Sequence, residues 1–76
     1  MKRDYSSIIK LLNTLNELHT GIGSKPLFKF GLVDGYLRIY AMRIDLSHLF
    51  SLLWSNTINY NLYLEHDGEN PYIEVI

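Results

Sequence analysis

The stretch that decides the fold is LFKFGLVDGYLRIYAMRI, residues Leu27 to Ile44. Asp34 and Gly35 separate two runs in which apolar side chains alternate with other residue types. A type I′ turn needs a positive φ at both of its central residues, and an Asp-Gly pair tolerates this conformation well. The pattern therefore predicts a β-hairpin closed by a two-residue turn at Asp34 and Gly35.

The two faces of this hairpin differ in chemistry. One face is apolar and is expected to face the core: Phe28, Phe30, Leu32, Leu37, Ile39 and Ala41. The other face combines aromatic, apolar and basic residues: Leu27, Lys29, Gly31, Val33, Tyr36, Arg38, Tyr40 and Met42. Such a composition is typical of a surface that binds a partner rather than of ordinary solvated strands.

Two amphipathic helices flank the hairpin. Apolar residues recur at helical spacing from Asp4 to His19, and the same pattern follows Asp45. Both aspartates are suitable N-cap residues, because a carboxylate accepts hydrogen bonds from the free N–H groups of a first turn. Gly21 or Gly23 can end the first helix.

A second hairpin is predicted at the end of the sequence. Residues 60–65 alternate between apolar and polar types, as in a half-buried strand. The segment DGENP at residues 67–71 predicts a longer loop, and a returning strand follows over Tyr72 to Ile76. The predicted fold class is therefore α+β: a two-layer αββαββ domain in which an antiparallel four-stranded sheet carries two helices on one face.

In this arrangement the helices cover the apolar face of both hairpins. The second hairpin is expected to add Tyr60, Leu62, Leu64, Ile73 and Val75 to the core. It adds to the opposite, open face Asn61, Tyr63, Glu65, Tyr72 and Glu74. Since the first hairpin is basic on this face and the second is acidic, we expect the open face to be electrostatically polarised.

The two halves of the chain, about residues 4–44 and 45–76, resemble each other. DYSSIIKLL from Asp4 aligns with DLSHLFSLL from Asp45, and each half then reaches an Asp-Gly pair. A duplicated αββ unit explains this similarity, and so does convergence, because capped amphipathic helices share the pattern. In either case 76 residues with 47% hydrophobic content form a single compact domain, residues 1–76.

Composition limits the classes of partner. The formal net charge of −1 gives no general attraction to nucleic acid or to an anionic membrane. No apolar run is long enough to span a bilayer, and no segment has the features of a signal peptide. The chain has no cysteine, which excludes disulfides and thiol chemistry. We expect a cytoplasmic protein with no membrane partner.

Catalytic arrangements have weak support. Asp45, Ser47 and His48 occupy one helical turn, where neighbouring side chains diverge instead of forming a triad. Glu65 and Glu74 can face each other across the second hairpin, but an open sheet provides no cleft around them. We expect a protein that is not an enzyme.

Cofactor and metal sites are also not expected. The segment GIGSKP at residues 21–26 lacks the spacing of a phosphate-binding loop. The acidic tip at residues 65–69 offers one histidine and no second histidine at ligand spacing.

The open face suits either of two macromolecular partners. Tyrosines on a sheet can stack nucleic-acid bases, so one hypothesis is a module that binds single-stranded nucleic acid through its tyrosine, arginine and lysine side chains. Charge disfavours it: Glu65 and Glu74 oppose Lys29 and Arg38 on this face, whereas DNA-binding proteins commonly neutralise about 6–10 phosphates. Further cations lie elsewhere in the sequence, at Lys2, Arg3 and Lys25.

A protein partner fits more of these residues, since tyrosine, arginine and methionine are enriched at protein interfaces. We expect a small protein-binding module that acts as a stoichiometric inhibitor or adaptor. Its richness in isoleucine, asparagine and tyrosine fits a phage or mobile element that targets a host enzyme or nucleoprotein complex. The expected contact residues are Lys29, Tyr36, Arg38, Tyr40, Met42 and Tyr63.

Two further interpretations concern the same face. The basic hairpin of one chain can face the acidic hairpin of another across a two-fold axis, which predicts a homodimer. Alternatively, the tyrosines are present only because aromatic residues favour exposed strands, with Tyr36 and Tyr40 shielding Gly31.

Overall fold

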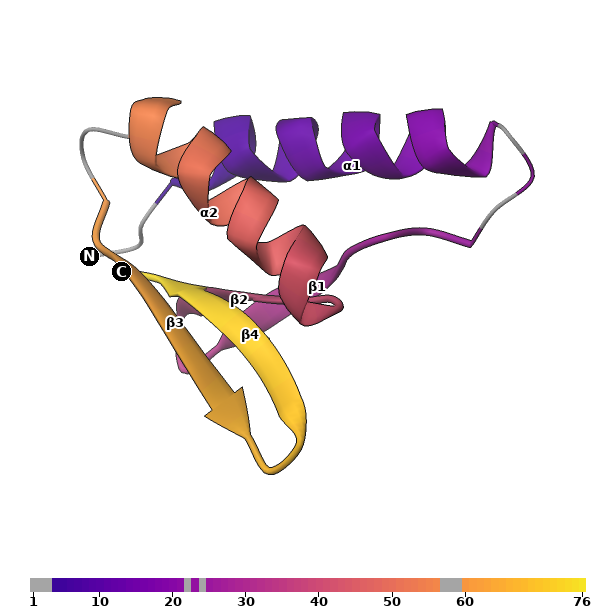
Figure 1. Ribbon diagram of the computed structural model, residues 1–76. Coiled ribbons are helices and arrows are strands. Elements are labelled where there is room, and N and C mark those ends of the chain that lie inside the picture. Colours follow the sequence, from indigo (N-terminus) through magenta and orange to yellow (C-terminus); the bar gives the residue numbers. More distant parts are fainter. Residues whose placement is uncertain (1–3, 22, 24, 57–59) are drawn as a thin grey trace.

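The computed structural model describes residues 4–21, 23, 25–56 and 60–76. Two helices and four strands follow one another along the chain (Figure 1): α1 (Ser6–Thr20), β1 (Lys29–Val33), β2 (Tyr36–Tyr40), α2 (Arg43–Asn56), β3 (Leu62–Asp67) and β4 (Asn70–Val75). The strands form one antiparallel sheet in the order β1-β2-β4-β3. The predicted α+β class and αββαββ order are confirmed.

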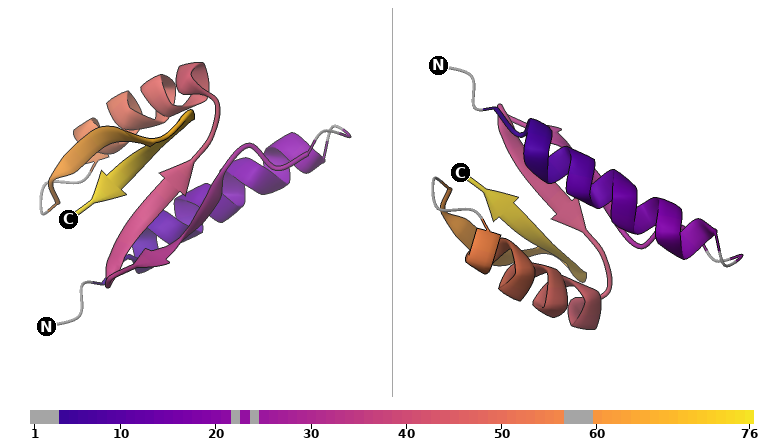
Figure 2. Two further views of the ribbon diagram at one scale, coloured as in Figure 1. Left: turned by 90° about the horizontal axis from the view of Figure 1, so that it is seen from below. Right: turned by 90° about the horizontal axis from the view of Figure 1, so that it is seen from above.

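Both helices lie on the same face of the sheet. The two views of Figure 2 show α1 over the first hairpin and α2 over the second, with the opposite face open. Each hairpin contributes one central and one edge strand, so the sheet order is symmetric about the β2–β4 pair. Duplication of an αββ unit is compatible with this order and stays a hypothesis.

The core fills the space between the helices and the sheet. Its side chains that are least exposed come from both helices and from the two central strands: Ile8, Leu12, Leu37, Ile39, Leu46, Leu53, Ile73 and Val75. Each of these burials removes apolar surface from water, which is the main favourable term in folding.

Two residues predicted to lie in the core are exposed. Leu32 is 62% exposed and Leu64 is 47% exposed, although each points to the same face as its buried partner across the hairpin, Leu37 or Ile73. The reason is their position on β1 and β3, which are edge strands with a neighbouring strand on one side only. Alternation assigns a face to a residue, but coverage of that face ends toward the sheet edge.

Neither helix has the N-cap residue predicted from the sequence. The N-cap residue of α1 is Tyr5 and not the predicted Asp4, but the Asp4 carboxylate still accepts a hydrogen bond of 2.9 Å from the Ser6 backbone N–H in the first turn and another from the Ser6 hydroxyl. These bonds, the hydroxyl one first, lower the pKa of Asp4. Helix α2 begins at Arg43, two residues before the predicted cap. Asp45 therefore lies inside the first turn, where its charge still favours the positive end of the helix dipole.

The two hairpin turns also differ. Asp34 and Gly35 have φ values of 54° and 84°, which confirms the type I′ turn. The predicted loop at residues 67–71 is wrong: the turn is the two-residue pair Gly68 and Glu69, and β4 already begins at Asn70. Pro71 is tolerated in β4 because the pairing of β4 with β2 ends at Tyr72, so only β3 lies beside it.

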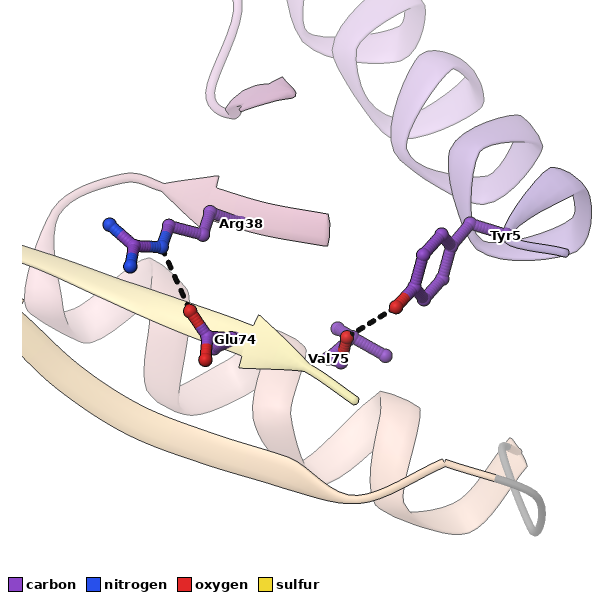
Figure 3. A network of polar contacts seen from close by, with 4 residues as sticks. All are labelled: Tyr5, Arg38, Glu74 and Val75. Carbon is purple, nitrogen blue, oxygen red and sulfur yellow. Dashed lines mark hydrogen bonds and ion pairs between the residues drawn. The ribbon is translucent and has the colours of Figure 1, made fainter. Parts of the chain in front are cut away.

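Long-range hydrogen bonds attach α1 to the sheet layer. The Asn16 side chain both donates to the Phe28 carbonyl and accepts from the Phe28 N–H, each at 2.9 Å. At the other end of the helix, the buried Tyr5 hydroxyl donates to the Val75 carbonyl at 2.7 Å (Figure 3). The Tyr5 ring also stacks on Tyr60, with centroids 5.5 Å apart. Hydrogen bonds thus attach both the start and the second half of α1 to the sheet layer.

Candidate functional site

The open face of the sheet is the surface that carries the predicted contact residues. The strand register aligns its side chains in two central rows that run across all four strands. In the order β1, β2, β4, β3, the first row is Gly31, Arg38, Glu74 and Tyr63. The second row, in the same order, is Lys29, Tyr40, Tyr72 and Glu65.

An ion pair holds the centre of the first row. The Arg38 Nε donates to the Glu74 Oε2 at 2.8 Å, and the two side chains are 24% and 21% exposed (Figure 3). The Arg38 guanidinium carbon also lies 4.5 Å from the ring centroid of Tyr72, a cation–π distance. Hydrogen bonding to Tyr40, followed by the contact with Glu74, raises the pKa of Arg38. Arg38 is therefore a charged group with two of its contacts already made inside the chain.

An aromatic pair forms the centre of the second row. Tyr40 and Tyr72 have ring centroids 5.3 Å apart and planes tilted by 45°. With Arg38 against its ring, Tyr72 is only 9% exposed, although it lies on the face that no helix covers. The contact residues expected from the sequence do not include Tyr72 or Glu74. Both were placed on this face, and only the β2–β4 pairing reveals that they organise Arg38 and Tyr40.

More exposed side chains surround this centre. Tyr36 at the start of β2 is 39% exposed, and Val33 opposite it is 37% exposed. Tyr63 on the edge strand β3 is 46% exposed. Met42, just beyond β2, is 72% exposed. Among the described residues, Tyr36 and Tyr63 thus lie at separate borders of the face, and Arg38 and Tyr40 form its fixed middle.

A shallow hollow lies at the end of the sheet where β1 and β4 begin. It has a volume of about 290 Å³ and includes Lys29, Tyr40 and Met42 among its lining residues. Pro26, Asn70 and Pro71 are further residues that line this hollow. Three of the six predicted contact residues are therefore gathered at one depression.

The charge of the face is polarised along the row direction. Lys29 and Arg38 lie on β1 and β2, whereas Glu65 and Glu74 lie on β3 and β4. Asp67 adds a further negative charge at the end of β3. The cations at positions 2 and 3, Lys2 and Arg3, lie outside the described residues.

Gly31 leaves a gap in the first row. A Cβ atom added there would meet no atom within 4 Å. The expected shielding of Gly31 by Tyr36 and Tyr40 is therefore wrong, because neither ring packs over it. The gap lies on β1, opposite Arg38.

A scan against protein-family models and searches of the curated proteins and of the solved structures find no match for this chain.

Asp45, Ser47 and His48 make separate contacts and do not form a triad. The Ser47 hydroxyl donates to the Arg43 carbonyl of its own helix at 3.1 Å. Asp45 and His48 line a hollow of about 200 Å³ whose other lining residues are apolar: Leu15, Leu27, Phe28, Leu49 and Leu52.

The sequence suggested that the two carboxylates of the second hairpin, Glu65 and Glu74, face each other. The strand register shows that they do not. Glu65 pairs with Tyr72 and Glu74 pairs with Tyr63, so the carboxylates are diagonal neighbours. The described residues contain no group of three or more His, Cys, Asp or Glu that could hold a metal ion. Within the described ranges, no helix is long and apolar enough to cross a membrane.

Proposed function

We propose that this chain is a small non-enzymatic protein-binding module whose open sheet face occupies a macromolecular partner, as an inhibitor or adaptor does. The observation that carries this proposal is the contrast between the centre of the face and its border. Arg38, Tyr40 and Tyr72 are fixed by contacts within the chain, whereas Tyr36 and Tyr63 are exposed around them.

The fixed centre favours binding because it lowers the cost of ordering side chains at an interface. Arginine and methionine side chains each lose considerable rotamer entropy when a partner immobilises them. Arg38 already contacts both Glu74 and Tyr72 within the chain, so less of its rotamer freedom is left to lose. The exposed tyrosines lose little entropy and offer a large apolar area, which is why tyrosine is common among interface hot spots.

The contacts of Arg38 support a protein partner over a nucleic acid. A phosphate would have to compete with the Glu74 carboxylate for this guanidinium. Lys29 is then the remaining cation in the two central rows, and Glu65 and Glu74 would repel a phosphate backbone from the other half of the face. Mixed charge of this kind orients a protein partner.

Site-specific cross-linking tests the proposal, and the absence of cysteine makes it simple. Single-cysteine variants Tyr63→Cys and Lys10→Cys each provide one attachment point for a photoreactive label, the first on the open face and the second at an exposed position of α1. Each labelled protein is added to an extract of the cells that produce it and is then irradiated.

We expect a protein adduct from position 63 and none from position 10. An adduct from position 63 that nuclease removes would support the nucleic-acid alternative instead. Equal protein adducts from both positions, or none from position 63, would overturn the proposal. The matched label at position 10 controls for non-specific capture.

A further inference from the structure

The two central rows of the open face are complementary to themselves when reversed. Along the second row the order is cation, aromatic, aromatic, anion, from Lys29 through Tyr40 and Tyr72 to Glu65. Along the first row the order is gap, cation, anion, aromatic, from Gly31 through Arg38 and Glu74 to Tyr63. Reversal therefore opposes each charge to a charge of the other sign.

A single symmetry operation performs this reversal. A two-fold axis that runs parallel to the strands, between β2 and β4, places β1 of one copy over β3 of the other. Each row then lies over the same row of the second copy, with its order reversed. Lys29 faces Glu65 of the second copy, and Arg38 faces its Glu74.

We propose that the open face binds a second copy of this chain, sheet against sheet, about this axis. The inference rests on the proposed function, since it names a partner for the same protein-binding surface. The interface is isologous, so every contact occurs twice. Two sheets that pack in this way keep their strands within about 30° of each other and lie roughly 10 Å apart.

The gap at Gly31 gives the interface a matching shape. Tyr63, at the other end of the same row, is 46% exposed and faces Gly31 of the second copy. A side chain at position 31 would occupy the space that the incoming ring needs, whereas glycine leaves it open. The exposed ring and the empty position thus complement each other twice per dimer.

The alternative symmetric arrangement is unfavourable. A two-fold axis perpendicular to the strands would place β1 over β1 and β3 over β3. The basic side of the face, with Lys29 and Arg38, would then lie over the basic side of the second copy, and the acidic sides would likewise face each other. Opposed like charges are destabilising, so the charge pattern selects the axis that is parallel to the strands.

The size of the face sets the expected strength. Strands of about five residues span roughly 17 Å, and four strands span roughly 19 Å across. These lengths give the face a flat outline of roughly 320 Å², well below the ~800 Å² of accessible surface that each partner buries in a standard interface. We therefore expect a weak, reversible dimer, which leaves the same surface accessible to another macromolecule at low concentration.

Charge reversal combined with sedimentation velocity tests the arrangement. Lys29→Glu and Glu65→Lys each convert two attractive contacts of the dimer into repulsive ones, so each alone is expected to weaken dimerisation about tenfold or more. Mixed in equal amounts, the two variants regain attraction at both contacts and should form a heterodimer. Lys10→Glu and Glu17→Lys make the same charge changes at exposed positions of α1 and should behave like the wild type.

The outcomes separate this inference from the proposed function. Dimerisation of the wild type, lost in each single variant and restored in the mixture, supports the arrangement. A chain that stays monomeric at every concentration, or a dimer that ignores both reversals, overturns it. In that case the proposed function still stands if the label at position 63 captures a different protein, and it fails if that label captures no protein.

Discussion

Replacing Leu37 by alanine is expected to lower the free energy of unfolding by about 2–5 kcal/mol. Leu37 is fully buried in the central strand β2, within the cluster that joins both helices to the sheet. The substitution removes apolar contacts and leaves a cavity that rigid neighbours fill only in part. Since a 76-residue domain is stable by roughly 4–11 kcal/mol, the variant should lose a large part of its stability.

Leu32→Ala is the matched control, because it deletes the same atoms from the residue directly opposite. Leu32 is 62% exposed, so the expected loss is below about 1 kcal/mol. Chemical denaturation of both variants measures the difference. Equal losses for Leu37→Ala and Leu32→Ala would contradict the description of β1 as an edge strand with an uncovered outer end.

The second large effect is expected on the open face itself. Tyr72→Ala should lower the free energy of unfolding by about 2–4 kcal/mol, because it removes the ring on which Arg38 and Tyr40 both pack. A surface tyrosine without such contacts would contribute far less. The same variant should also make the Arg38 side chain more mobile. It loses the cation–π contact with Tyr72 and keeps its hydrogen bonds to Glu74 and Tyr40.

Tyr63→Ala provides the control on the same face. Tyr63 is 46% exposed on the edge strand β3, and its loss should cost below about 1 kcal/mol. Thermal unfolding distinguishes the two variants. If Tyr72→Ala were as mild as Tyr63→Ala, the centre of the open face would not be a fixed cluster, and the proposed pre-organisation of Arg38 would be wrong.

Local patterns were sufficient for much of the fold. The Asp-Gly turn is encoded by two adjacent residues with positive φ, and helix α1 is encoded by an apolar stripe and by the Asp4 carboxylate that accepts from the Ser6 N–H. These features depend on neighbours in the sequence. The alternation of the first hairpin likewise placed Tyr36, Arg38 and Tyr40 on one face, as the register shows.

Features that depend on distant segments were not predictable from the sequence. The β2–β4 pairing joins residues about half the chain apart, and it alone brings Arg38 to Glu74 and Tyr40 to Tyr72. The exposure of Leu32 and Leu64 depends on which strands lie at the edges. The turn at Gly68 and Glu69 escaped prediction because Pro71 suggested a loop, and only the sheet order explains why a strand accepts it.

If this chain binds protein through its open sheet face, substitutions on that face should weaken the affinity and substitutions on the helices should not. The partner is the protein captured through position 63, whether a second copy or another protein. We compare the double variant Tyr36→Ser/Tyr63→Ser with the double variant Leu18→Ser/Trp54→Ser, which removes exposed apolar side chains from the helices instead.

Isothermal titration of the purified proteins gives the dissociation constants. Two interface tyrosines at about 1–2 kcal/mol each predict affinity that is weaker by a factor of about 30 or more for the open-face variant. The helix variant should bind like the wild type. Unchanged binding by a folded Tyr36→Ser/Tyr63→Ser protein, with loss in the helix variant, would place the interface on the helices and contradict binding through the open face.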